Sequence, residues 1–92
     1  MVNVRSEVLD EAKRLINSDR QRQYGTPQEN FGRIAAMWSA YLGVKVGEAD
    51  VAVCMALLKA ARLANEHKRD SFVDGAAYFA LAAELSDDRE DL

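Results

Sequence analysis

The chain has 92 residues, of which 49% are apolar and 29% are charged, and its formal net charge at pH 7 is −3. This length suits one domain, and the composition excludes an intrinsically disordered chain. The charge balance excludes a basic surface for binding nucleic acid, and no apolar run is long enough to span a membrane. We therefore expect a cytoplasmic protein with a single helical domain over residues 1–86 and an acidic tail over residues 87–92.

The first predicted helix covers about residues 3 to 18, where apolar residues recur at helical spacing. Its apolar stripe is narrow, so this helix should lie at the edge of the core. A polar loop follows and ends at Gly25. Thr26-Pro27-Gln28-Glu29 then forms a capping box with proline at the first helical position. The second helix should begin there and end before Gly43.

The second helix carries most of the aromatic bulk of the chain, including Trp38 and Tyr41, which we expect in the core or in an interface. The third helix has Glu48 or Asp50 in its first turn, where a carboxylate opposes the positive helix end. It runs to about Ala64 and is apolar on nearly every side, so it should be buried nearly all round. A chain this short cannot cover such a helix alone, and the pattern therefore predicts a homo-oligomer, a dimer or larger.

Cys54 is the only cysteine, and its apolar neighbours predict a buried small side chain. A polar turn over residues 66–69 precedes the fourth helix, which Asp70 or Ser71 should cap and which should end near Leu85. The expected fold is all-α: four helices, of which the third and fourth form a central antiparallel hairpin.

Two charged stripes face each other across this predicted hairpin. The stripe on the third helix contains Lys59, Arg62 and Glu66, and the stripe on the fourth contains Asp70, Asp74 and Tyr78. If the turn is centred near Lys68, Arg62 and Asp74 lie at the same level.

These stripes allow two interpretations. In the first they form a pocket in which Lys59 and Arg62 bind phosphate, while Asp70, Asp74 and Glu66 hold Mg²⁺. In the second, Arg62 and Asp74 form a structural ion pair that allows two charged residues to lie in the core. Such structural ion pairs commonly resemble functional sites.

Tyr24 and Asn30 suggest a base-binding edge, with the tyrosine ring stacked on a nucleobase and the amide hydrogen-bonded to it. The alternative is an aromatic turn residue that packs on the start of the second helix. No catalytic residue can be assigned, because the chain contains no nucleophile motif, phosphate-binding loop or zinc-ligand set.

Several segments together resemble a family of small uncharacterised phage and prophage proteins. The resemblance runs from about residue 15 to 82 and is carried by the segments RQYGxPxxNF from Arg22, WSAYLG from Trp38, LKxAR from Leu58 and DSxxDxxxY from Asp70.

A more distant resemblance is to the all-α nucleotide pyrophosphohydrolases of the MazG-like and dimeric dUTPase-like type. This likeness implies Mg²⁺ held by carboxylates of two helices and hydrolysis of nucleoside triphosphates. The chain departs from that pattern, because its third helix has Lys59 and Arg62 where those enzymes have a carboxylate pair.

Three functions follow as hypotheses. The first is a phage-type, MazG-like nucleotide-binding protein, with Mg²⁺-dependent pyrophosphohydrolysis as its enzymatic form. The second is a binder that sequesters or senses a nucleotide without turnover, and the third is a structural or partner-binding oligomer.

Overall fold

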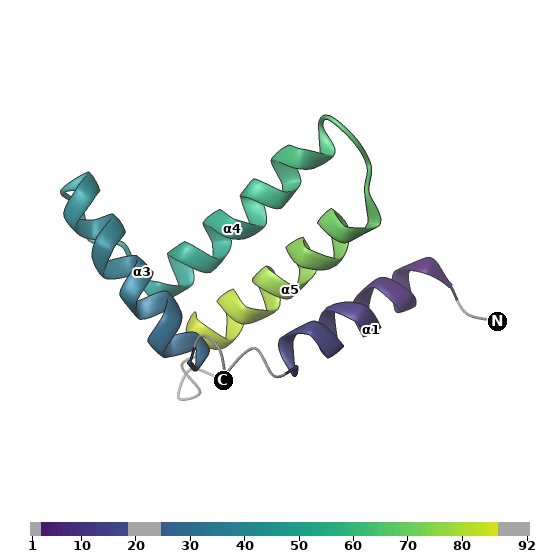
Figure 1. Cartoon of the computed structure of the whole chain (residues 1–92), viewed down its shortest axis with the longest axis horizontal. Coiled ribbons are helices and arrows are strands. Elements are labelled where there is room, and N and C mark those ends of the chain that lie inside the picture. Colours follow the sequence, from purple (N-terminus) through teal and green to yellow (C-terminus); the bar gives the residue numbers. More distant parts are fainter. Residues whose placement is uncertain (1–2, 19–24, 87–92) are drawn as a thin grey trace.

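The computed structural model describes residues 3–18 and 25–86, and within them it contains four helices and no strand (Figure 1). The helices are α1 (Val4–Ile16), α3 (Pro27–Leu42), α4 (Glu48–Leu63) and α5 (Arg69–Ser86). The predicted all-α class is confirmed. The predicted acidic tail lies outside the described residues.

The start of α3 has the local chemistry that the sequence predicts. The Thr26 hydroxyl accepts a hydrogen bond from the Glu29 backbone N–H at 3.1 Å and donates one to Glu29 Oε1 at 3.2 Å. Pro27 occupies the first turn, where no N–H donor is required. At the other end Gly43 has a φ of 72°, which favours glycine, and its N–H donates to the Ser39 carbonyl. Both ends of α3 are therefore fixed by neighbouring residues.

We expect Thr26→Ala to lower the free energy of unfolding by about 1 kcal/mol, because the Glu29 N–H loses its acceptor. Denaturant titration followed by far-UV circular dichroism measures this change. Thr26→Ser keeps the hydroxyl and serves as the control, so an equal loss in both variants would contradict the capping role.

The main core lies where α3, α4 and α5 meet. Its buried side chains are Phe31, Ala35, Val51, Ala52 and Ala82, and Trp38, Met55 and Tyr78 are among the partly buried residues packed against them. Val51 and Ala52 have no exposed surface. Two of the buried residues, Ala52 on α4 and Ala82 on α5, have small side chains, and these two helices lie side by side along their lengths (Figure 1).

α1 packs against α5 through a second, smaller cluster of Ala12, Val73 and Ala77. At the start of α5, the Arg69 guanidinium donates from Nε to Glu11 Oε1 at 3.0 Å and from Nη2 to Glu7 Oε2 at 3.0 Å. These hydrogen bonds, Glu11 first and then Glu7, raise the pKa of Arg69. α1 therefore lies at the edge of the molecule, as predicted.

Two local predictions are wrong. Cys54 is exposed on the outer side of α4. Tyr41, expected in the core or in an interface, is 90% exposed near the end of α3 and so does not belong to the core of the chain. α5 begins at Arg69, so Asp70 and Ser71 lie inside its first turn and do not cap it. The helix begins earlier than predicted, because the Ser71 N–H donates a hydrogen bond to the Lys68 carbonyl.

Candidate functional site

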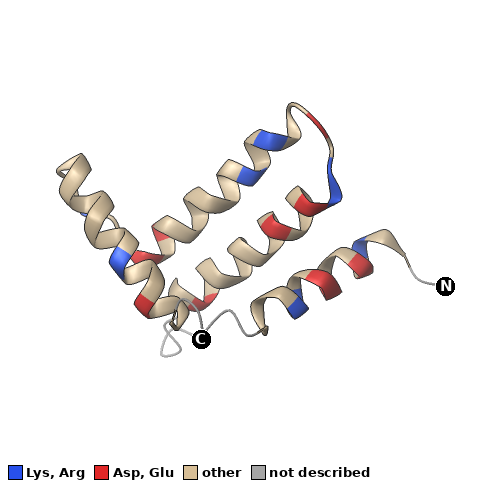
Figure 2. Cartoon of the chain, viewed as in Figure 1, with Lys and Arg blue, Asp and Glu red and all other residues tan. Residues whose placement is uncertain are grey.

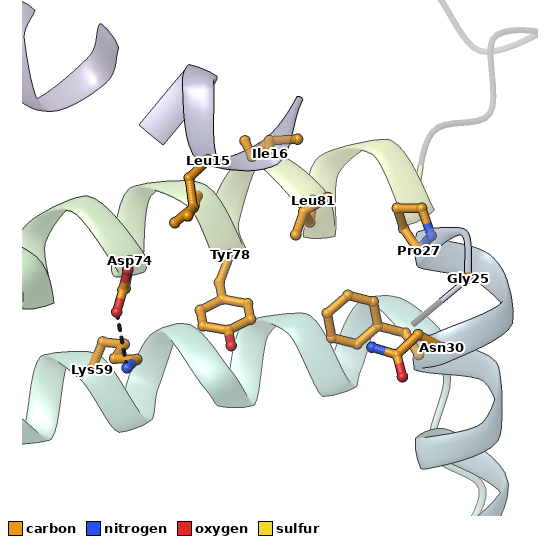
Figure 3. Close-up of a pocket in the computed structure, with 11 residues that line it drawn as sticks. Leu15, Ile16, Gly25, Pro27, Asn30, Lys59, Asp74, Tyr78 and Leu81 are labelled. Atoms are coloured by element: carbon orange, nitrogen blue, oxygen red, sulfur yellow. Dashed lines mark ion pairs between the residues drawn. The ribbon is translucent and has the colours of Figure 1, made fainter. Parts of the chain in front are cut away.

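A pocket of about 300 Å³ opens where the end of α1 and the start of α3 meet the middle of α4 and α5 (Figure 3). The described residues that line it are Leu15, Ile16, Gly25, Pro27, Asn30, Phe31, Lys59, Asp74, Ala77, Tyr78 and Leu81. Most of these are apolar; the charged pair lies at one end, Asn30 lies at the other, and Tyr78 with its hydroxyl lies between them. This volume is at the lower limit for small-molecule sites.

One end of the pocket holds an ion pair. Lys59 Nζ lies 3.0 Å from Asp74 Oδ2, and the two side chains are 15% and 30% exposed (Figure 3). An ammonium group has three donors and a carboxylate has about four acceptor positions, so one contact leaves most of this capacity open. The pair can therefore receive a ligand without being broken.

This ion pair corrects the predicted register of α4 and α5. Arg62 was expected opposite Asp74, but Lys59 takes that position and the Arg62 side chain is exposed. The connecting loop covers residues 64–68, so its centre lies about two residues before the assumed centre at Lys68. The partner of Asp74 on α4 accordingly shifts back by almost one turn.

The centre of the pocket is aromatic. The Phe31 and Tyr78 rings meet edge to face, with centroids 6.4 Å apart and an interplanar angle of 81°. Tyr78 lies between the ion pair and Asn30 in Figure 3. The pocket thus offers apolar ring surface between two polar ends.

The other end is formed by the start of α3. Gly25 has a φ of 84°, a backbone conformation that favours glycine, and Glu29 Oε2 lies 2.9 Å from the position that a Cβ atom would take there. Asn30 lies one turn into the helix, half-buried, with its side-chain amide beside the pocket (Figure 3). The positive end of α3 therefore faces the same cavity as the amide.

The structure brings together three of the predicted site residues, namely Asn30, Lys59 and Asp74. Glu66 and Asp70 are exposed, and Glu66 approaches Lys68 at 3.7 Å. In residues 3–18 and 25–86, no group of three or more His, Cys, Asp or Glu side chains could hold a metal ion. Tyr24 lies outside the described residues.

Sequence reasoning missed the contribution of α1. The apolar stripe of the first helix predicts only that Leu15 and Ile16 face the core. In the structure both side chains also line the pocket. Gly25 gave a usable signal, because a glycine directly before a capping box marks a special backbone conformation.

A double-mutant cycle at Lys59 and Asp74 tests the ion pair. We expect Lys59→Met and Asp74→Asn to show a coupling of about 1 kcal/mol in the free energy of unfolding, since the pair is shielded from water but not fully buried. The same cycle at Lys68 and Glu66, an exposed pair, should give a coupling near zero. Equal couplings would mean that the Lys59–Asp74 pair is no better formed than a surface contact.

The family model described as "Domain of unknown function (DUF6378)" matches residues 7–86. The chain belongs to this family. Gene 55 protein of Mycobacterium phage D29 is 46% identical over 72 residues, which cover 77% of this chain and 48% of the phage protein. Gene 55 protein of Mycobacterium phage L5 is 45% identical over 80 residues, which cover 85% of this chain and 51% of that protein.

This DUF6378 chain thus spans about half the length of the curated relatives it matches. The expected phage protein family is confirmed. No solved structure matches the chain. Among the described helices of this DUF6378 protein, none combines the length and the apolar character needed to cross a membrane.

Proposed function

We propose that this protein binds a mononucleotide in the pocket between α1, α3, α4 and α5, without turning it over. The observation that carries the proposal is the convergence of Asn30, Lys59 and Asp74 on one cavity with aromatic walls. Sites for small organic ligands are mostly apolar, with a few polar groups that fix the orientation of the ligand. A nucleoside monophosphate combines a flat apolar face with polar groups at both ends, so its chemistry matches this lining.

A nucleotide could enter in either of two orientations, because both ends of the pocket are polar. In the orientation that the sequence suggests, Lys59 binds phosphate, exposed Arg62 assists it from the surface, and Asn30 binds the base. In the reverse orientation the Lys59–Asp74 pair meets the base, and the start of α3 meets the phosphate.

Binding without hydrolysis is favoured by the donor set on α4 and α5. Mg²⁺ needs convergent oxygen ligands, but Glu66 and Asp70 are exposed and do not line the pocket, and the Lys59 ammonium 3.0 Å from Asp74 would repel a cation there. The three residues therefore do not fit a magnesium site.

A melting experiment on the purified protein tests nucleotide binding. Ribonucleoside and deoxyribonucleoside monophosphates and triphosphates are added singly, with and without Mg²⁺, and inorganic phosphate is the control. A ligand at 100 times its dissociation constant adds about 2.7 kcal/mol, which raises the melting temperature of a domain this size by roughly 10 °C or more. Lys59→Met should abolish this rise, whereas Lys68→Met should not. If none of the nucleotides raises the melting temperature, the proposal fails.

Pyrophosphohydrolysis and MazG-like descent are tested in the same samples. The shared all-α class is what supports this descent. If pyrophosphate is released from any triphosphate in the presence of Mg²⁺ or Mn²⁺, the protein is a pyrophosphohydrolase and the proposal of binding without turnover is wrong.

We also propose that the protein forms a homo-oligomer through the outer side of α4, with α4 and α5 as its antiparallel hairpin. Figure 2 shows that the charges of α4 lie toward its two ends, and the segment from Val51 to Leu58 carries none. Val53, Leu57 and Leu58 are large apolar residues on that segment, and all three are exposed. Light scattering after size exclusion should give a mass above 10.2 kDa that Leu57→Glu returns to the monomer value. A monomeric wild-type protein would end this proposal.

A further inference from the structure

We propose that the Lys59–Asp74 ion pair recognises the Watson–Crick edge of guanine, and that the preferred ligand is a guanine nucleotide. This inference rests on the proposed nucleotide binding, and it selects the orientation with the base at the ion pair. It assigns Asp74 to base recognition, in place of the metal-binding role that the sequence suggests for this residue.

The charge at this end of the pocket favours a neutral base. Lys59 and Asp74 are the charged residues among the described lining, and they neutralise each other at 3.0 Å. A phosphate placed against Lys59 would also approach the Asp74 carboxylate, and the two like charges would repel each other. A neutral base meets no such repulsion. The ion-pair end therefore suits a base better than a phosphate.

The order of donors and acceptors on the ion pair matches guanine. The ammonium of Lys59 only donates, and the carboxylate of Asp74 only accepts. The ammonium and the carboxylate side by side therefore match the edge of a base on which an acceptor lies next to donors. Guanine presents the O6 acceptor beside the N1–H and N2–H donors, so one carboxylate can accept two hydrogen bonds while the ammonium donates to O6. Adenine, cytosine and uracil each lack the two adjacent donors.

The surface next to the ion pair is aromatic and apolar. Tyr78 separates the Lys59–Asp74 pair from Asn30 in Figure 3, and the apolar residues Ala77 and Leu81 also line the cavity. Bases are commonly held by ring surface while their edges are read by polar groups. A base whose edge faces the ion pair would lie along this aromatic part of the pocket.

The sugar and phosphate would then point toward the start of α3. Gly25, Pro27 and Asn30 line that end, where the Asn30 side-chain amide is a hydrogen-bond donor and the positive end of the α3 dipole favours an anion. The Glu29 carboxylate in the same turn accepts a hydrogen bond from the Thr26 hydroxyl. The opposite orientation would place a phosphate beside Asp74.

Isothermal titration calorimetry with GMP, IMP, AMP and UMP tests the inference on the unmodified protein. We expect GMP to bind most tightly. IMP, which lacks the 2-amino group, should bind roughly 10- to 100-fold more weakly, because one hydrogen bond to a charged group is lost. If AMP, UMP or IMP binds as tightly as GMP, guanine recognition is wrong, although nucleotide binding stands. If none of the four binds, the nucleotide proposal itself fails for monophosphates.

Asp74→Asn provides a second, independent readout. The side-chain amide keeps an oxygen for N1–H and presents an NH₂ group to position 2, where xanthine has a carbonyl and guanine an amine. We expect the variant to lose affinity for GMP and gain affinity for XMP, a reversal that a purely structural role would not produce. Asp70→Asn, on the same helix but outside the pocket, is the matched control and should leave the GMP affinity unchanged. Equal losses for GMP and XMP in Asp74→Asn would overturn the assignment of Asp74 to the base.

Discussion

Phe31→Ala is expected to lower the free energy of unfolding by about 3 to 5 kcal/mol. The Phe31 ring is 6% exposed and belongs to the main core, where it also meets Tyr78 edge to face. Alanine would leave a cavity beside Val51, which has no exposed surface and little room to move. Domains of this size are stable by only about 5 to 15 kcal/mol, so this single change removes much of the stability.

Chemical denaturation monitored by circular dichroism measures the loss, and Phe79→Ala is the matched control. Phe79 lies on α5 and is 53% exposed, so the same truncation there should change the stability by about 0.5 kcal/mol or less. If both variants lose the same amount, either the core does not centre on Phe31 or Phe79 is covered in an oligomer. Light scattering on the wild-type protein distinguishes these two outcomes.

Ala56→Leu is expected to destabilise the protein by about 1 to 3 kcal/mol through overpacking. Ala56 is 1% exposed and lies on the buried side of α4. A leucine there must push α4 away from the neighbouring helix or adopt a strained rotamer, because packed interiors contain few voids. The close approach of α4 and α5 depends on such small side chains.

The control is Ala60→Leu, one turn further along α4 at an exposed position. Leucine and alanine are both good helix formers, so the stability of this variant should stay close to that of the wild-type protein. Thermal melting of the two variants side by side makes the comparison. If Ala60→Leu lowers the melting temperature more than Ala56→Leu does, Ala56 does not lie on the buried side of α4.

The helices could be predicted because their signals are local. Thr26, Pro27 and Glu29 fix one end of α3 and Gly43 fixes the other, and each acts through atoms within four residues. The apolar pattern of α4 likewise requires a helix, whatever the helix packs against. Such signals need no knowledge of tertiary structure.

The register between helices could not be predicted in the same way. The partner of Asp74 depends on where α4 ends and α5 begins, and a difference of two residues in the centre of the loop exchanges Arg62 for Lys59. The exposure of Cys54 has a related cause. A uniformly apolar helix does not specify which side its own chain covers.

The candidate site was only partly predictable for the same reason. Lys59, Asp74 and Asn30 stand out individually because polar groups beside apolar stripes are conspicuous in sequence. The pocket exists because α1 brings Leu15 and Ile16 against them from a distant part of the chain. Only the packing of α1 on α5 places those side chains there.

The attachment of α1 has a kinetic consequence. α1 packs mainly against α5, through a small cluster and the contacts of Arg69 with Glu7 and Glu11, so its detachment should cost less than global unfolding. A molecule held in the pocket touches both α1 and the main core, and would have to lose its contacts with Leu15 and Ile16 before α1 could lift away. Amide hydrogen exchange in α1 should slow when the pocket is filled, and loosening the Arg69 contacts should shorten the residence time of the ligand.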